Sequence, residues 1–436
     1  MRINPRALLT LIGLGALLVV ALWWNDTLVV HGFGDWLTNA GRITGLLAGY
    51  CIVVQLLLMA RIPAIERGVG ADRLARWHSF GGRYTISLVV AHTLLIIWGY
   101  AVTAHTNVVS QTGTLLTAYP DVMMATVALG LFLMIAAISA RAARQRLSYE
   151  TWYHLHFYTY LAVALAFSHQ FATGADFATN LQARVLWGGL YAVVGAALLW
   201  FRFIVPLRQR VRHRMVVDNV VQEAPGVVSI VMRGQHLDEL QPEPGQFFRW
   251  RFLTRSGWWQ SHPYSLSAPP HPRLLRITVK DLGDHSGELQ HIHKGTRVFA
   301  EGPYGAFTAH RRRRRKVLLL AGGIGITPLR TLLETLPGEP GDLTLVYRVN
   351  HADEIVFRHE LDLLADQRGA RVLYLIGPPG SDADPFLGSR LAAHVPGLRS
   401  YDVFLCGPPG FTAAATTALR AAKVPAGHIH SEQFAF

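Results

Sequence analysis

The stretch Val317-Leu318-Leu319-Leu320-Ala321-Gly322-Gly323-Ile324-Gly325-Ile326-Thr327-Pro328 decides the fold of the C-terminal part of the chain. Its first five residues form an apolar run with the length of a buried strand. The glycines that follow let a backbone come close to phosphate groups, and Pro328 suits the first turn of a helix. We therefore predict a strand, a nucleotide-binding turn and a helix. The residues expected to hold the nucleotide are Gly322, Gly323, Gly325, Thr327 and Pro328.

The order of strand and helix repeats to the end of the chain. Apolar strands are expected at 343–347, 371–376 and 403–405, and helices from Pro328, Phe357 and Phe411. This alternation is typical of an α/β domain with a parallel, doubly wound sheet, which we assign to 311–436. A second signature, Cys406-Gly407-Pro408-Pro409-Gly410, follows a strand at the edge where such sheets bind ligands. Cys406, Gly407 and Pro408 are expected near a nicotinamide; the alternative is that Cys406 only packs in a turn.

Residues 214–308 alternate short β-rich runs with turn signals, which predicts a small antiparallel β-barrel domain at 207–310. One strand carries His262-Pro263-Tyr264-Ser265-Leu266-Ser267. An aromatic ring there can stack on an isoalloxazine, and a hydroxyl can hydrogen-bond near its N5. Lys280, Ser286 and Gly287 lie around the start of a short helical run that suits a pyrophosphate. The alternative is an ordinary surface strand and turn.

Composition sets residues 1–206 apart from these domains. The whole chain is 51% hydrophobic and 16% charged, with a net charge of +13 and two cysteines. So apolar a composition excludes a disordered or ordinary soluble chain, and two cysteines exclude a disulfide scaffold or a cysteine-ligated iron–sulfur cluster. A six-helix transmembrane bundle is expected, with spans at 7–24, 43–60, 79–103, 121–139, 152–172 and 184–205. The first is expected to be a retained span; a cleaved signal peptide is the alternative.

Loop charges predict the orientation of this bundle. Arginines cluster between the second and third spans, between the fourth and fifth, and after the sixth, whereas 25–41, 104–120 and 171–183 contain no Lys or Arg. The positive-inside rule then places both termini and the soluble half in the cytoplasm, with the bundle in the inner membrane. The basic charge is therefore expected to face membrane lipid and not nucleic acid.

Histidines on the third and fifth spans give a chemical signal inside the membrane. His78 and His92 are 14 positions apart, which is about 21 Å along a helix and within about 40° of one face. His156 and His169 are 13 positions apart, and a straight helix would turn them about 140° away from each other. His154 fits a straight helix better, unless a π-turn corrects the phase. Matched histidines at two depths predict two haems with paired axial imidazoles; histidines that only pack between helices are the alternative.

The soluble signatures resemble those of the ferredoxin–NADP reductase superfamily, and with the histidine pairs the chain resembles bacterial NADPH oxidases and ferric reductases. The resemblance implies FAD in the barrel, NAD(P)H on the parallel sheet and two b-type haems in the membrane. It implies as haem ligands His78, His92, His156 and His169. It also implies that Tyr264 and Ser265 face the flavin, and that the terminal aromatic Phe436 covers it until the nicotinamide displaces that ring. The expected catalytic residues are Ser265, Cys406 and Phe436.

The implied activity is electron transfer from NAD(P)H through FAD and two haems to an acceptor outside the cytoplasm. Dioxygen, giving superoxide, is the preferred acceptor, with ferric iron as the alternative. Two other hypotheses stay open: a haem subunit that feeds a periplasmic partner, and a non-enzymatic membrane channel with a regulatory nucleotide-binding module. Arg348 follows a strand, where it would meet an adenosine 2′-phosphate and favour NADPH over NADH. The run Arg311–Arg315 is predicted to be a solvated linker, with a contact to anionic lipid as the alternative.

Overall fold

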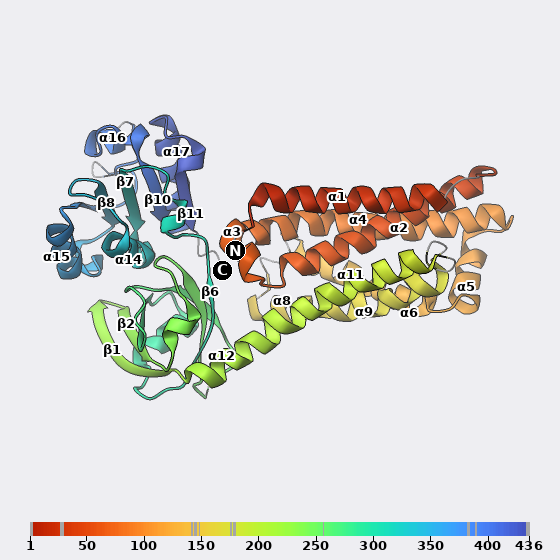
Figure 1. Ribbon diagram of the computed structural model, residues 1–436, viewed down its shortest axis with the longest axis horizontal. Coiled ribbons are helices and arrows are strands. Elements are labelled where there is room, and N and C mark those ends of the chain that lie inside the picture. The colour runs from red at the N-terminus through yellow and green to blue at the C-terminus, as the bar shows by residue number, and fades with distance from the viewer. Residues whose placement is uncertain are drawn as a thin grey trace. The chain divides into compact units, whose positions relative to one another are not determined.

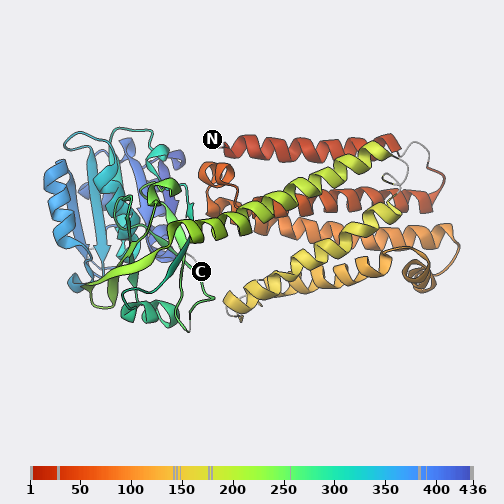
Figure 2. The same ribbon diagram turned by 60° about the horizontal axis from the view of Figure 1, so that its bottom comes forward.

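The computed structural model describes residues 3–26, 30–140, 143, 146–147, 149–174, 177, 180–255, 257–381, 384–388 and 390–432. The chain forms two compact units, one from 1–65 and 73–202 and the other from 66–72 and 203–436. In Figures 1 and 2 the first unit consists of helices that run side by side, and the second contains the strands.

The helices up to the end of the first unit follow the apolar runs of the sequence. They are α1 (Pro5–Asp26), α2 (Phe33–Leu58), α3 (Pro63–Val69), α4 (Ala71–Thr103), α5 (Val108–Ala118), α6 (Val122–Ser139), α8 (Tyr149–His156), α9 (Tyr158–Thr173) and α11 (Leu181–Leu199). A π-helical turn (Trp200–Ile204) and α12 (Val205–His213) follow directly on α11. Apolar runs form helices here because a helix satisfies its backbone donors and acceptors within the segment, as lipid requires.

The prediction of a membrane-spanning region is confirmed, but six spans are not. In the described part of the chain, five helical segments are long and apolar enough to cross a membrane: 5–25, 33–58, 73–103, 122–139 and 181–213. The expected span 152–172 is divided at Phe157 into helices of 8 and 16 residues, and neither reaches the ~20 residues that a bilayer needs. The interruption coincides with irregular backbone hydrogen bonds at Phe157.

The strands that follow form two small antiparallel sheets. These strands are β1 (Val216–Ala224), β2 (Val227–Arg233), β3 (Phe247–Phe252), β4 (His262–Ser265), β5 (Leu274–Lys280) and β6 (Val298–Tyr304), in the orders β1-β2-β5 and β4-β3-β6. Along β3, Phe248, Trp250 and Phe252 are fully buried while the arginines between them point away, so the period-2 pattern builds one core. Single bridges join the sheets at Leu266–Ile277 and Val216–Arg297. The antiparallel domain is present, whereas a closed barrel is not confirmed.

The C-terminal strands form the predicted parallel sheet. It contains β7 (Val317–Gly322), β8 (Leu343–Val349), β9 (Arg371–Ile376), β10 (Asp402–Cys406) and β11 (Ile429–Glu432) in the order β11-β10-β7-β8-β9, with every neighbouring pair parallel. One core cluster packs α14 (Ile326–Thr335) and α15 (Arg358–Arg368) on one face; another packs α16 (Arg390–His394) and α17 (Pro409–Ala421) on the other. The strand order reverses between β7 and β10, which defines the ligand edge of a doubly wound sheet.

The arginine run at 311–315 is anchored to the parallel-sheet domain through its backbone. The backbone N–H groups of Arg313 and Arg314 both donate to the carboxylate of Asp402 at the start of β10, and the Arg315 Nε lies 3.1 Å from Asp342. Burial opposes ionisation of Asp402, but these donors and His428 outweigh it and hold the pKa of Asp402 below its ordinary value. Asp402 thus holds the backbone of the run, and Asp342 pairs with the side chain of Arg315, which stays largely exposed.

We predict that a fragment of residues 205–436 folds alone and is more stable than one of 215–436. In α12, Gln209 donates to the carbonyl of Gly302 (2.8 Å), and His213 exchanges two hydrogen bonds with Gln235 (2.8 and 3.0 Å). At ~1 kcal/mol per bond, their loss should lower the melting temperature by roughly 5–10 °C. Circular dichroism of both fragments measures this. Equal melting temperatures would contradict the assigned role of α12.

Candidate functional site

Both predicted histidine pairs come together inside the helical unit. The ring centres of His78 and His156 (the first pair) lie 6.0 Å apart, and those of His92 and His169 (the second pair) lie 6.3 Å apart. An imidazole nitrogen binds a metal at ~2.0–2.1 Å and lies about 1.1 Å from its ring centre, so two axial imidazoles of one iron have ring centres ~6 Å apart. The spacing of each pair therefore fits one haem iron.

The first pair depends on the interruption at Phe157. The N–H of Phe157 is shared between the carbonyls of Tyr153 and His154, at 3.2 Å each. The N–H of Tyr160 donates to the Phe157 carbonyl three residues back, at 3.0 Å. Such bonds tighten a helix to about 120° per residue in place of about 100°. At about 100° per residue, 13 residues fall about 140° short of a whole number of turns. Each tightened residue adds about 20° of rotation and so reduces this shortfall, whereas a π-turn would increase it.

With this tightened turn, the ring that faces His78 is that of His156, whereas the His154 ring does not face His78. His154 is exposed, and its ring lies edge-on to that of Tyr153 with 5.9 Å between centres. Trp152 stacks on His156 with 5.0 Å between centres and 28° between planes. The sequence analysis missed Trp152, although residues four apart share a helix face and the spacing could have indicated it.

Backbone carbonyls hold the second pair in one tautomer. The Nδ1–H of His92 donates to the carbonyl of Gly41 (2.8 Å), and the Nδ1–H of His169 donates to that of Ala166 (2.7 Å). A neutral imidazole that donates from Nδ1 keeps a lone pair on Nε2, which is the form that binds iron. A side chain at Gly45 on α2 would place its Cβ 2.6 Å from His92 Nδ1, so this position requires glycine. The sequence analysis missed both glycines.

A cavity of about 240 Å³ surrounds the second pair. His92 and His169 both line it, together with apolar residues that include Ile52, Leu129 and Phe132. A mostly apolar cavity with two convergent imidazoles is the environment that a haem macrocycle requires. The residues present therefore fit a haem at the second pair.

On the flavin side, Ser265 is the residue whose environment most clearly indicates a ligand. It ends β4, is buried, and its hydroxyl has no hydrogen-bond partner among the residues that the structure describes. A buried hydroxyl without a partner is costly unless something else binds it. Tyr264 beside it is partly buried, and burial raises the pKa of its phenol, which stays neutral. These two residues fit the predicted contacts with an isoalloxazine.

The other residues of this motif have structural partners. Leu266 has no exposed surface and belongs to the core between the two sheets. Ser267 accepts a hydrogen bond from the Thr278 hydroxyl (2.8 Å), which also bonds to Ser229. Pro263 pairs with Arg249 in the sheet, and His262 stacks on His285 from α13 (Asp284–Glu288), with 4.1 Å between ring centres. Direct contact of the Leu266 and Ser267 side chains with a cofactor stays a prediction.

The predicted pyrophosphate residues lie on a turn beside that stack. The Ser286 hydroxyl accepts from the N–H of Leu282 (2.8 Å) and donates to the carbonyl of Gly283 (2.7 Å), so it shapes the turn. A Cβ on Gly287 would lie 3.2 Å from an Asp281 oxygen, so a larger residue would fit there only if Asp281 shifted. Lys280 instead reaches Glu354 of the parallel-sheet domain, at 3.1 Å.

The two glycine signatures meet at the ligand edge of the parallel sheet. Cys406 pairs with Ala321 on the neighbouring strand, which brings the turns after β7 and β10 together. A Cβ on Gly325 would lie 2.3 Å from the Cys406 carbonyl oxygen, and one on Gly407 would lie 3.1 Å from the Cα of Gly322. Only glycine lets these two backbones touch. Gly323 has a positive φ of 54° and open space beyond it, as an approaching phosphate requires.

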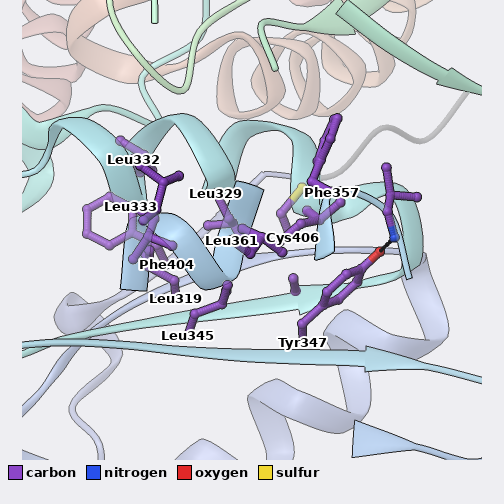
Figure 3. Close-up of a cluster of buried hydrophobic side chains, with 14 of the residues drawn as sticks. Leu319, Leu329, Leu332, Leu333, Leu345, Tyr347, Phe357, Leu361, Phe404 and Cys406 are labelled. Atoms are coloured by element: carbon purple, nitrogen blue, oxygen red, sulfur yellow. Dashed lines mark hydrogen bonds between the residues drawn. The ribbon is translucent and has the colours of Figure 1, made fainter. Parts of the chain in front are cut away.

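The remaining predicted nucleotide residues are placed as follows. Cys406 has no exposed surface and lies among Leu329, Phe357 and Leu361 (Figure 3), the packing alternative of the sequence analysis. Arg348 is buried at the end of β8, where its Nη2 donates to the carbonyl of Gly377 (2.9 Å). Thr327 donates to the carbonyl of Ile324, Pro408 precedes α17, and Pro328 is buried in α14. Phe436 lies outside the described residues.

An ion-pair cluster that the sequence analysis missed joins the two soluble domains. Arg276 on β5 donates twice to the Glu360 carboxylate on α15, at 2.7 and 2.9 Å, and once to the carbonyl of Ser267, at 2.7 Å. Arg330 on α14 also donates to Glu360, at 2.7 Å. Burial opposes ionisation of Glu360, but Arg276 and Arg330 outweigh it and hold its pKa below the ordinary value. Arg276 therefore links Ser267, which follows β4, to helices α14 and α15 of the parallel-sheet domain.

Three known protein families match three successive segments of the chain. Residues 44–167 match the ferric reductase like transmembrane component, 219–308 match an FAD-binding domain, and 319–417 match the oxidoreductase NAD-binding domain.

The curated relatives resemble the soluble half. The ferredoxin reductase component of 3-ketosteroid-9-alpha-monooxygenase from Mycolicibacterium smegmatis is 30% identical over 238 residues, 52% of this chain and 67% of that protein. The stachydrine N-demethylase reductase subunit from Rhizobium meliloti is 30% identical over 49% of this chain and 64% of that protein. The chain thus spans about two thirds of their length. The FAD/NAD-binding domain of a Vibrio cholerae nitric oxide dioxygenase aligns with a TM-score of 0.44 and 28% identity, over 51% of this chain and 98% of that one.

The fold and the three matched segments define a membrane oxidoreductase with an FAD- and NAD(P)-binding module. The chain belongs to the ferric reductase-like transmembrane family, with a soluble half of the ferredoxin–NADP reductase type.

We predict that Gly325→Ala impairs the nucleotide domain. The added Cβ meets backbone that cannot move aside, which should destabilise the domain by roughly 1–3 kcal/mol and weaken NAD(P)H binding. Thermal unfolding and NAD(P)H titration of the 205–436 fragment measure both effects. Gly410→Ala in α17 is the matched control, because nothing lies within 4 Å of its Cβ and alanine favours helix. Equal behaviour of the two variants would contradict the close backbone contact.

We predict that Glu360→Gln destabilises the same fragment by about 2 kcal/mol at pH 7. Because the folded pKa of Glu360 is depressed, its stabilising effect is present above the unfolded value of about 4.3 and disappears as the pH falls through the folded value. Urea unfolding at pH 7 and at a series of pH values below about 4.3 should therefore show the two free energies of unfolding converging only in the acidic part of the series. Glu239→Gln, in an exposed pair with Arg212, should change nothing measurable. A difference independent of pH would contradict the ionic role.

Proposed function

We propose that the protein carries electrons from NAD(P)H, through FAD and two b-type haems, to an acceptor across the inner membrane. One observation carries this proposal: the helical unit contains two facing pairs of imidazoles, and the same chain continues into an FAD- and NAD-binding module. Bound FAD and haem would supply two-electron and one-electron redox chemistry, respectively. The non-enzymatic channel hypothesis gives no reason for two imidazole pairs of equal spacing.

In the membrane half, the chain's own residues bind and orient. His78 with His156, and His92 with His169, would each hold one iron. Two ligand sites separated by 14 residues of α4 lie about 21 Å apart along that helix, which spreads them across most of a bilayer core of ~30 Å.

In the soluble half, the residues hold and align the two cofactors. The Ser265 hydroxyl would bind the flavin, and Tyr264 would lie against its ring. The glycine turns would let the nucleotide phosphates reach the backbone, and Arg348 at the end of β8 would favour the 2′-phosphate of NADPH. The Arg276–Glu360 ion pair would hold β5 of the antiparallel domain against α15 of the parallel-sheet domain.

The acceptor that we favour is dioxygen, with superoxide as the product. Ferric iron is the second candidate, and the transmembrane segment's match to the ferric reductase like component supports it. Superoxide and ferrous-iron assays on the purified protein decide between them. Activity with neither acceptor, but with a periplasmic protein fraction, would favour a haem subunit that feeds a partner.

We predict that the purified protein holds two haems and that His92→Ala or His169→Ala removes one. The remaining pair keeps its iron, and NAD(P)H oxidation by an artificial acceptor on the flavin stays intact, because the soluble residues are unchanged. A pyridine haemochrome assay measures haem per chain. His154→Ala is the matched control and should retain both haems, since the first pair uses His156. Wild-type protein without haem, or both variants with two, would contradict the proposal.

A further inference from the structure

Arg202 is a charged residue close to the C-terminal end of the last predicted span, 184–205. It lies on the π-helical turn after α11, within an apolar segment long enough to cross a bilayer. Its Nη1 donates to the carbonyl of Met59 (2.9 Å), and its Nη2 donates to the hydroxyl of Tyr153 (3.4 Å). Its guanidinium carbon lies 5.9 Å from the centre of the Phe157 ring.

These contacts join three elements beside the first histidine pair. Met59 caps the C-terminal end of α2, where the last carbonyls of a helix lack partners within it. Tyr153 lies on α8, three residues before His156, and Phe157 is the interruption between α8 and α9. Arginine suits this junction, because its planar fork donates in several directions and its face packs on aromatic rings.

The π-turn accounts for how this side chain reaches the junction. A π-turn holds more residues than an α-helical turn, so it redirects the side chains that it carries. Arg202 is the central residue of the turn Trp200–Ile204. Single π-turns within helices occur frequently at functional sites. Two departures from regular helix, the π-turn and the tightened turn at Phe157, therefore meet at one guanidinium.

We propose that Arg202 is the positioning residue of the first histidine pair. By holding Tyr153 and Phe157, it maintains the tightened turn that keeps His156 directed at His78. Without the guanidinium, α8 and α9 can relax toward a straight helix, which turns His156 away from His78. The inference rests on the proposed function, in which this pair binds haem.

A purely stabilising role for Arg202 makes a different prediction. If the side chain only held the helices together, its removal would weaken both pairs. A positioning role spares the second pair, because His92 and His169 have their own bonds to the carbonyls of Gly41 and Ala166. The two roles are therefore distinguished by which haem is affected.

The test uses the full chain purified in detergent, as wild type and as Arg202→Leu, Arg202→Lys and Tyr153→Phe. Arg184→Leu is the matched control, since Arg184 lies on the same helix and packs over Phe171 at 5.8 Å, so its loss removes one charge and one ring contact. Haem per chain is measured by pyridine haemochrome, FAD per chain by absorbance, and the haem midpoint potentials by spectroelectrochemical titration. Electron paramagnetic resonance of the ferric protein reports the relative orientation of each pair of axial rings.

We expect Arg202→Leu to fall from two haems to one, with FAD unchanged, and Arg202→Lys to lie between it and the wild type. Tyr153→Phe should keep two haems with an altered resonance signal for one of them, and Arg184→Leu should match the wild type. Two haems with unchanged potentials and signals in Arg202→Leu would overturn the proposal, as would equal loss of both. If Arg202→Leu does not fold, an unchanged resonance spectrum of Tyr153→Phe overturns it. Wild type without haem overturns the proposed function as well.

Discussion

Two helices can present facing imidazoles at two levels only if each helix returns to the same face after about 20 Å. An α-helix turns about 100° per residue, so α4 meets this condition over 14 residues, and a straight helix does not over 13. The tightened turn at Phe157 supplies part of the missing rotation. The division of α8 from α9, the exposure of His154 and the pairing of His156 with His78 accompany this tightening.

Glycine serves the same purpose in both units, which is to bring a functional group closer than a side chain would allow. At Gly45 it leaves room for the His92 ring, and at Gly325 it lets the two turns of the nucleotide sheet touch. In each case the neighbour that a Cβ would meet belongs to the predicted site. Substitutions at these glycines therefore act on ligand geometry, although neither glycine has a side chain that can bind anything.

Much of the fold follows from local patterns. Alternating strands and helices predict the parallel sheet because its central strands, such as Val317–Gly322, are buried on both faces and read as continuous apolar runs. The anchoring of the arginine run by Asp402 and the Arg276–Glu360 cluster could not be predicted, since each depends on contacts between residues far apart in the chain. The burial of Leu266 and Cys406 was hidden for the same reason: motif position indicates a ligand edge but not which side chains face it.

Electron transfer across a membrane is the property that the paired imidazoles are proposed to provide. Purified protein in proteoliposomes, with a reducible protein acceptor such as cytochrome c trapped inside and NADPH added only outside, tests it directly. We expect the trapped acceptor to be reduced by the fraction of molecules whose soluble half faces outward, and disruption of either histidine pair to stop this reduction. Reduction only of acceptor added on the NADPH side, with the trapped pool untouched in intact vesicles, would contradict it.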